Sequence, residues 1–290
     1  MVPVLITWDI DPYYQNELDK SIRLTIKLLK ELNIKSTFFF TAKYANEEII
    51  KTLLKEGHQV GCHGLYHDDH EELDKLPYTE QKQLLDKATK ILEEKSKTKI
   101  TAFRGPRVKI SAQTIKVLEE LGYNADSTIG SQRLDLISSN LINLGWLIAP
   151  RKPYHPARNN PYRKGSSSIL EIPVSAAIIP FISTSLKIFG LSFMKSLFNI
   201  LYKESKRTGK PIVYLIHPIE FLSKKTKFDI KYLIPSKRWL IHGLPIRHYL
   251  AGRKDGKETY LNKRLFQYIS SKKDVKFMNV DEYLKTKVPK

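Results

Sequence analysis

The stretch Gly57–His70, GHQVGCHGLYHDDH, combines a short strand with two histidines, and the prediction of the fold starts from it. Val60 lies in a brief apolar run that a glycine precedes and a polar cluster follows, which is typical of a strand. The strand delivers His63 and His67, which would share one face if the chain turns helically after it. Two neutral imidazoles placed in this way suit a small divalent cation. Two solvated histidines are the alternative, so the interpretation depends on the other strand ends.

Buried strands and amphipathic helices alternate around this stretch, at about 25 to 30 residues per unit. This alternation predicts an α/β fold whose parallel strands close into a barrel or form a doubly wound sheet. In barrel enzymes the active site lies at the carboxyl ends of the strands. Strands are predicted at 2–8, 36–41, 99–103 and 123–127, and helices at 16–32, 46–56, 80–95 and 112–121.

Beyond residue 127 the alternation is less regular. Residues 150–168 are rich in proline, asparagine, arginine and serine and are predicted to form an excursion, and residues 224–257 form a basic segment with aromatic residues. No linker divides the chain, so residues 1–290 are interpreted as a single domain. The other predicted elements are strands at 169–174, 211–216 and 275–278, helical sequence at 178–202, and a helix at 261–271.

The chain carries a formal net charge of +19, with 49 lysines and arginines against 30 acidic residues. Such a field attracts nucleic acid, anionic lipid or phosphate-bearing substrates without choosing among them. The lysines are scattered over helix-like segments, where solvated faces explain them. Zinc-finger cysteines, an aromatic ribonucleoprotein motif and a glycine-rich phosphate loop are all lacking. Nucleic-acid binding is therefore not the expected main function.

Cysteine usage and the chain's start bear on the compartment. Cys62 is the single cysteine, so no internal disulfide can form, and its place on a strand predicts a buried structural residue. The first residues, MVPVLITWDI, lack the features of a secretory signal. No run of about 18 uncharged apolar residues is present. The expectation is a cytoplasmic protein without a membrane span.

Polar side chains suited to metal chemistry gather at four predicted strand ends. Two histidines and one carboxylate with an open coordination position form the ligand pattern of a catalytic zinc, or of a similar metal that activates water. One further carboxylate and one further histidine remain for proton transfer. The side chains concerned are Asp9 and Asp11, His63 and His67, Arg104, and His217.

The motifs that carry these residues resemble those of the polysaccharide deacetylase family, the NodB-homology group of carbohydrate esterases. Thr7–Asp11, TWDID, looks like the family's first motif, with one residue between the aspartates. His63–His67 matches its motif of two histidines separated by three residues, with Gly64 where serine or threonine is usual. Phe103–Pro106 is similar to the third motif and Leu215–Pro218 to the last.

The resemblance extends to residues 277–284 and implies a distorted, incomplete (β/α) barrel of the NodB-homology type. It implies a hydrolase that removes an N-acetyl or other N-acyl group from an amino sugar of a polysaccharide or a lipid-linked glycan. It also implies that Asp11, His63 and His67 hold one divalent metal ion. Zinc is the first expectation, and cobalt, nickel or manganese are alternatives.

The same resemblance assigns roles to the remaining polar residues. Asp9 is expected to be the general base, Arg104 to orient it, and His217 to be the general acid. Asp126, in a loosely matching fourth motif, is expected to pair with His217 and raise its pKa. Arg107 stands where many members carry tyrosine, and its side chain would bias the pocket toward anionic ligands.

Further residues are placed around the expected site. Pro106 belongs to the third motif and is a candidate for contact with the substrate or the metal shell. His58, His70 and His155 are expected at the surface, with His70 close enough to shape the rim of the site. Trp8 and Trp146 are expected in the core.

Two other functions and one other partner stay open. An allantoinase-like hydrolase of a ureide or cyclic amide would use a related site, and a non-catalytic basic protein that binds carbohydrate or nucleic acid would use none.

Residues 178–202 place large apolar side chains near helical spacing, with Lys187 and Lys195 among them. This pattern is compatible with a helix on an anionic membrane, and core packing is the alternative.

Overall fold

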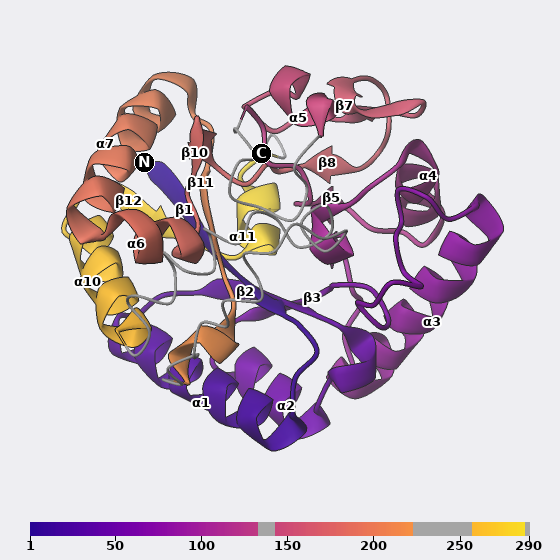
Figure 1. Cartoon of the computed structure of the whole chain (residues 1–290), viewed down its shortest axis with the longest axis horizontal. Coiled ribbons are helices and arrows are strands. Elements are labelled where there is room, and N and C mark those ends of the chain that lie inside the picture. The colour runs from indigo at the N-terminus through magenta and orange to yellow at the C-terminus, as the bar shows by residue number, and fades with distance from the viewer. Residues whose placement is uncertain (133–142, 223–256, 288–290) are drawn as a thin grey trace, which may run out of the picture.

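The computed structural model describes residues 1–132, 143–222 and 257–287. In these residues, parallel strands form one curled sheet and helices cover its outer side (Figure 1). The strands of this sheet are β1 (Val2–Ile10), β2 (Ser36–Phe40), β3 (Gln59–Cys62), β4 (Ala102–Phe103), β5 (Ala125–Asp126), β8 (Leu170–Glu171), β11 (Ile212–Ile216) and β12 (Val275–Phe277). The helices are α1 (Gln15–Glu31), α2 (Glu47–Lys55), α3 (Tyr78–Ser96), α4 (Ala112–Glu120), α5 (Leu144–Ile148), α6 (Ser183–Phe189), α7 (Leu191–Thr208), α10 (Glu258–Ser270) and α11 (Val280–Lys285).

The strand order is that of an open barrel. Neighbours run in the order β11-β1-β2-β3-β4-β5-β8, and β12 also pairs with β1. Every one of these pairings is parallel. Strands that follow one another from β1 to β5 are adjacent in space, as expected for successive β/α units. The predicted distorted, incomplete barrel is therefore confirmed.

The alternation of side chains along β1 places the first acidic residue inside the barrel. Ile6 and Trp8 belong to the large apolar cluster shared with the surrounding helices, whereas Leu5 belongs to a smaller inner cluster. Because successive side chains of a strand point to opposite faces, Thr7 and Asp9 share the inner face with Leu5. β1 ends at Ile10, two residues later than predicted, because its backbone stays paired with β2 that far.

Local sequence signals set several helix ends. The Asn46 side chain accepts a hydrogen bond from the backbone N–H of Glu48 at the start of α2. Gly57, with φ of 81°, follows the end of that helix, in the left-handed region that favours glycine. At α4 the predicted cap is confirmed, since Ser111 and Thr114 form a capping box.

The barrel is incomplete between β8 and β11, which do not pair along a ladder. Ser175 spans part of this seam, because its N–H donates to the Val213 carbonyl at 3.1 Å and its hydroxyl accepts from the Val213 N–H at 3.0 Å. An isolated parallel bridge joins Ile182 to Leu215 farther along β11. The two edges of the curled sheet are thus brought together at a few contacts only.

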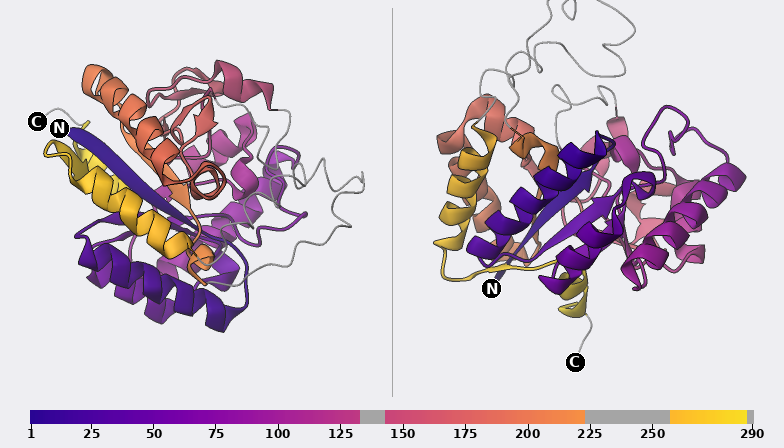
Figure 2. Two further views of the ribbon diagram at one scale, coloured as in Figure 1. Left: turned by 60° about the vertical axis from the view of Figure 1, so that its left-hand side comes forward. Right: turned by 90° about the horizontal axis from the view of Figure 1, so that it is seen from below.

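α11 covers the end of the barrel where the strands begin. The N–H of Val280 donates to the Thr37 hydroxyl at the start of β2, and the N–H of Asp281 donates to the Gln59 side chain at the start of β3. Tyr283 belongs to the inner apolar cluster. Figures 1 and 2 show α11 within the ring of strands in one view and at one end of them in another. The opposite end, where the strands finish, carries the predicted site.

The less regular parts of the sequence differ in outcome. The excursion at 150–168 contains the antiparallel pair β6 (Pro156–Ala157) and β7 (Asn160–Lys164), and β9 (Ala176–Ala177) pairs with β10 (Ile179–Pro180). The predicted basic segment at 224–257 lies, up to residue 256, outside the described residues. Among the residues that are described, none of the helices is both long and apolar enough to cross a membrane.

Candidate metal centre and active site

Asp11, His63 and His67 meet at the carboxyl ends of β1 and β3. Oδ1 of Asp11 lies 3.3 Å from Nε2 of His63 and 3.4 Å from Nε2 of His67. One ligand atom from each of the three residues lies within 4.8 Å of the other two. The structure therefore brings together the three side chains that the sequence proposes as metal ligands.

The backbone fixes which nitrogen of His63 faces this cluster. The residue follows β3 directly, and its N–H donates to the Phe40 carbonyl at 2.7 Å. Its Nδ1 lies 2.8 Å from the backbone carbonyl of Arg104, so this nitrogen carries the proton in the neutral ring. Nε2 is then left with a lone pair toward Asp11, which is the arrangement that metal-ligating histidines commonly show.

His67 reaches the cluster through a loop, and not through the helical turn that was one way to place both histidines on one face. His67 has φ of 58° and lies outside any helix. The buried carboxylate of Glu71 accepts hydrogen bonds from the N–H groups of Leu65, Tyr66 and His67 at 2.7 to 2.8 Å. These three bonds replace helical ones and hold the loop that presents His67.

Gly64 is required by the same loop. It has φ of 76°, and a Cβ at this position would lie 2.6 Å from Cγ of Pro106 and 2.7 Å from Oε1 of Glu71. Both the backbone conformation and the packing therefore exclude the serine or threonine that related motifs carry here. Pro106, a predicted site residue, packs against this glycine and so supports the loop between the two histidines.

The three residues fit a divalent cation. Oδ1 of Asp11 is buried and makes no hydrogen bond to any described residue, although two Nε2 atoms lie beside it. Burial alone would raise the pKa of Asp11, but the imidazoles of His217, His67 and His63 outweigh it and lower the pKa. One ionised carboxylate and two imidazoles form a donor set that zinc and similar metals accept.

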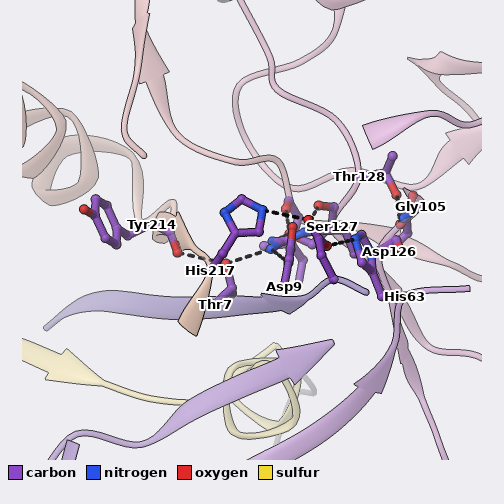
Figure 3. Close-up of polar contacts among 12 residues, drawn as sticks. Thr7, Asp9, His63, Gly105, Asp126, Ser127, Thr128, Tyr214 and His217 are labelled. Carbon is purple, nitrogen blue, oxygen red and sulfur yellow. Dashed lines mark hydrogen bonds and ion pairs between the residues drawn. The ribbon is translucent and has the colours of Figure 1, made fainter. Parts of the chain in front are cut away.

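Asp9 forms a buried ion pair with Arg104 next to the cluster, and Figure 3 shows Asp9 between His217 and His63. Nη1 of Arg104 donates to Oδ1 of Asp9 at 2.7 Å and to the Thr7 hydroxyl at 2.9 Å. Nε and Nη2 donate to the carbonyl and hydroxyl oxygens of Ser127, both at 2.8 Å. The guanidinium also lies 4.5 Å from the centroid of the Phe39 ring. Arg104 is thus held on all sides and fixes one oxygen of Asp9.

His217 follows β11 and faces the cluster from the other edge of the sheet. Its Nε2 lies 3.5 Å from Oδ2 of Asp11, and its Nδ1 lies 3.2 Å from Oε1 of Glu220. Burial lowers the pKa of His217, but Asp11 and Glu220 outweigh this and raise the pKa to about 9. The expected pairing with Asp126 is wrong, since η3 (Pro218–Phe221) begins directly after His217 and folds Glu220 back onto it.

Asp126 instead pairs with strand β8. It stands opposite Glu171 in the ladder between β5 and β8, and its Oδ1 accepts a hydrogen bond from the Thr128 hydroxyl at 2.5 Å. Burial raises the pKa of both carboxyls, and each has an oxygen with no other partner among the described residues. A proton shared between the two acids accounts for both observations.

The other sequence predictions have mixed outcomes. Arg107 is close to the loop, but its guanidinium already binds the carboxylates of Asp69 and Glu72, at 2.7 and 3.2 Å, which weakens the expected attraction for anionic ligands. His70 is exposed, as expected. The prediction that His58 lies at the surface is wrong, because this residue is 5% exposed and its ring packs on Phe38.

The buried residues expected in the core are found there. Trp8 and Trp146 are both fully buried, and so is Cys62. Burial raises the pKa of the Cys62 thiol to about 12, so the thiol stays protonated. The interpretation of Cys62 as a structural residue, and not as a ligand beside His63, is confirmed.

Residues 2–125, which carry Asp9, Asp11, both histidines of the cluster and Arg104, match the family model for polysaccharide deacetylase. The predicted resemblance to the polysaccharide deacetylase family is confirmed over these residues. No curated protein sequence matches the chain.

Several solved structures share the fold along almost the whole chain. A protein from Mycobacterium smegmatis assigned to the polysaccharide deacetylases is 17% identical, with a TM-score of 0.64, and the match covers 98% of this chain and 89% of that one. A second, from Pseudomonas aeruginosa PAO1, is 15% identical with a TM-score of 0.61 over 98% and 90%. Puue allantoinase is 15% identical with a TM-score of 0.59 over 98% and 89%. The fold is thus of the NodB-homology type.

Two residues of the site were not predicted from the sequence. Glu71 holds the loop of His67, but it is one of four acidic residues in the run from Asp68 to Glu72, and nothing in that run distinguishes it. Glu220 holds Nδ1 of His217. Its spacing of three residues from His217, across a proline, is the signal of a capping box that would have found it.

Proposed function

We propose that this protein is a metal-dependent hydrolase that removes an N-acetyl or other N-acyl group from an amino sugar. The observation that carries the proposal is the cluster of Asp11, His63 and His67 with the buried Asp9–Arg104 pair and His217 beside it. The match of residues 2–125 to the polysaccharide deacetylase family supports it. The chemistry of this family is hydrolysis of an amide bond on a sugar.

Asp11, His63 and His67 would hold the metal through one carboxylate oxygen and two Nε2 atoms. When bound, a divalent cation supplies Lewis-acid chemistry, which polarises an acyl carbonyl and makes water more acidic. Zinc suits two imidazoles and a carboxylate best, and cobalt, nickel or manganese can occupy such a set.

Asp9 is proposed as the general base. Arg104 occupies its Oδ1, so the lone pairs of Oδ2 are left to accept a proton from the attacking water. Arg104 keeps the carboxylate in one orientation through its own bonds to Thr7 and Ser127. A fixed base needs less rearrangement in the transition state.

His217 is proposed as the general acid. Glu220 holds its Nδ1, and Nε2 lies on the side of Asp11, where a leaving amine would depart. The Glu220 carboxylate beside Nδ1 favours the protonated imidazole, and an acid must carry its proton before it donates.

A lipid-linked amino sugar at an anionic membrane is the proposed setting. Residues 178–202 are partly core, since Leu186, Leu197 and Leu201 are buried. Along the same segment Phe189 and Phe193 remain 40% and 38% exposed, with ring centroids 4.8 Å apart. These exposed rings and the net charge of +19 support contact with anionic lipid, to which Lys187 adds little because its Nζ is paired with Glu258 at 2.9 Å.

A screen of substrates tests the proposed activity. The zinc-loaded protein is incubated with N-acetylated oligosaccharides, a lipid-linked amino sugar and ureides, and mass spectrometry follows the products. Loss of an acyl group from an amino sugar, abolished by chelation and restored by metal, is expected. Cleavage of ureides alone would favour the second candidate, an allantoinase-like hydrolase, whose solved example shares the fold. Full turnover after complete removal of metal would contradict the proposal.

A further inference from the structure

A hollow lies at the end of the barrel opposite the metal cluster. Its volume is about 660 Å³. Its walls include residues that precede or begin β5, β8 and β11, and residues of α11: Asn124, Leu170, Lys210 and Tyr283. These positions surround the base of the seam between β8 and β11, so the hollow is called the seam pocket.

The open seam explains why a hollow exists there. β8 and β11 are not joined by a ladder, and the contacts between Ser175 and Val213 close only the part nearer the middle of β11. At the base, Gly209 comes just before β11 and offers no side chain. The space is therefore left to the side chains of the surrounding loops.

The lining of the seam pocket is basic. Lys152, His155, Lys210 and Lys287 all contribute to it, and no carboxylate does. Nζ of Lys210 lies 2.7 Å from the carboxylate of Glu204, so its charge is paired. Among the described residues, Lys152 and Lys287 make no ion pair, and Nζ of Lys287 lies 5.0 Å from the centroid of the Tyr283 ring. Two uncompensated cations thus border one concave surface.

One further residue adds polar atoms to this lining. Nδ1 of His155 lies 3.0 Å from the Ile169 carbonyl, so in the neutral ring this nitrogen donates to that carbonyl and Nε2 is an acceptor. The hydroxyl of Tyr283 has no hydrogen-bond partner among the described residues, but it is buried and so lies below the surface of the hollow.

We propose that the seam pocket binds a small, soluble molecule that carries a phosphate group. Lysine ammonium groups are suitable donors to phosphate oxygens. The volume is in the range of about 300 to 1,000 Å³ that small-molecule sites occupy. Pro153 and Leu170, which are both half-buried, supply apolar surface for the rest of the ligand. The site is separate from the metal cluster and does not depend on the proposed hydrolase activity.

Calorimetric titration of the full-length, zinc-loaded protein tests the proposal. Glucose 1-phosphate is the probe, glucose is its neutral counterpart, and the ionic strength is held constant. Saturable binding of glucose 1-phosphate without binding of glucose is expected. If neither compound binds, or both bind equally, the proposal is overturned.

Two double variants locate the binding. Lys152→Ala with Lys287→Ala should weaken the binding of glucose 1-phosphate by about tenfold, since two charge-assisted contacts are lost. Lys55→Ala with Lys87→Ala removes the same charge from exposed positions on α2 and α3 and should leave the affinity unchanged. Equal affinity in the two double variants would overturn the site. So would binding that is lost in His63→Ala and kept in the Lys152 and Lys287 variant, because it would place the phosphate at the metal.

Discussion

Nη1 of Arg104 lies 2.7 Å from Oδ1 of Asp9, and the two side chains are 0% and 4% exposed. Taking two charges out of water is costly, and a buried pair persists only when further hydrogen bonds complete it. Thr7 and Ser127 provide those bonds to the guanidinium. The pair is therefore a unit of structure, and it also holds the proposed base.

Removing one member of this pair should destabilise the fold. Arg104→Met is expected to lower the free energy of unfolding by about 3 to 5 kcal/mol, because the charge of Asp9 stays buried without a partner. Adding Asp9→Asn to it should recover most of the loss, while turnover stays absent in both proteins. Urea unfolding at neutral pH measures the first effect and acyl release the second.

An exposed ion pair is the control for the substitutions at Arg104 and Asp9. Arg23→Met breaks the pair with Glu48, whose side chains are 54% and 84% exposed, and should cost less than about 1 kcal/mol. An Arg104→Met protein as stable as Arg23→Met would show that the buried pair contributes little.

The single substitution Asp9→Asn should keep the metal and lose most turnover, because an amide cannot take the proton from the attacking water. Unchanged turnover would remove Asp9 from the mechanism.

The metal assignment predicts a loss that is specific to the cluster. His63→Ala should abolish stoichiometric zinc binding and turnover, because one of three ligands and its tautomer-fixing bond to the Arg104 carbonyl are lost. Elemental analysis after dialysis measures the zinc. His155→Ala, which alters a histidine outside the cluster, should keep it. Stoichiometric zinc in the purified His63→Ala protein would mean that the ligand set is wrong.

Glu71 should control the metal site without touching the metal. Glu71→Gln keeps the size of the side chain but turns one of its two acceptor oxygens into a donor, so the N–H groups of Leu65, Tyr66 and His67 cannot all be satisfied. Zinc affinity is expected to fall by about 10- to 100-fold, as for other residues that orient ligands. A competition titration with a chromophoric chelator measures it.

Glu80→Gln, on the exposed surface of α3, is the matched control for this substitution. It should leave zinc affinity unchanged. If Glu71→Gln binds zinc as tightly as Glu80→Gln, the loop must hold His67 by other means.

Much of the barrel follows from sequence patterns that act locally. The apolar run of β1, the cap at Ser111 and the glycine after α2 each predict an element end or a face within a residue or two. Because parallel strands deliver their carboxyl ends to one edge, the gathering of Asp11, His63 and His67 could be predicted as well. These features depend on neighbours in the sequence or on the common direction of the strands.

Other features depend on partners far apart in the chain. β4, β5 and β8 are only two residues each, although longer strands are predicted at 99–103, 123–127 and 169–174. The partner of Asp126 is Glu171, on a strand that the fourth motif does not contain. No local pattern could distinguish this pairing from the expected one with His217.

The burial of His58 should make stability depend on pH. Burial lowers the pKa of His58 from 6.5 to about 4, while Glu56 acts in the opposite sense and Lys35 in the same sense. Between these two values the unfolded chain binds a proton that the folded chain does not, so stability falls as the pH falls from 6.5 to 4. From pH 7 to pH 5 this group contributes a loss of about 2 kcal/mol.

The variant His58→Leu removes this titration and keeps an apolar contact with Phe38. Urea unfolding of both proteins at pH 7 and pH 5 isolates the effect, because all other titrating groups are shared. The loss on acidification should be about 2 kcal/mol smaller in the variant. Equal losses in the two proteins would show that His58 is protonated in the folded state.

The proposed membrane contact makes a prediction about two aromatic residues. Phe189→Ser with Phe193→Ser removes the exposed ring pair between α6 and α7 and should weaken binding to anionic liposomes at low salt by at least about tenfold, since each buried ring contributes about 1.5 to 3 kcal/mol. Leu144→Ser with Ile148→Ser, which removes exposed apolar side chains from α5, is the matched control and should bind like the unaltered protein. Sedimentation with vesicles at low and high salt separates the electrostatic part, because salt screens exposed charges. Equal partitioning onto neutral and anionic vesicles, or equal binding of the two double variants, would leave Phe189 and Phe193 as ordinary surface residues.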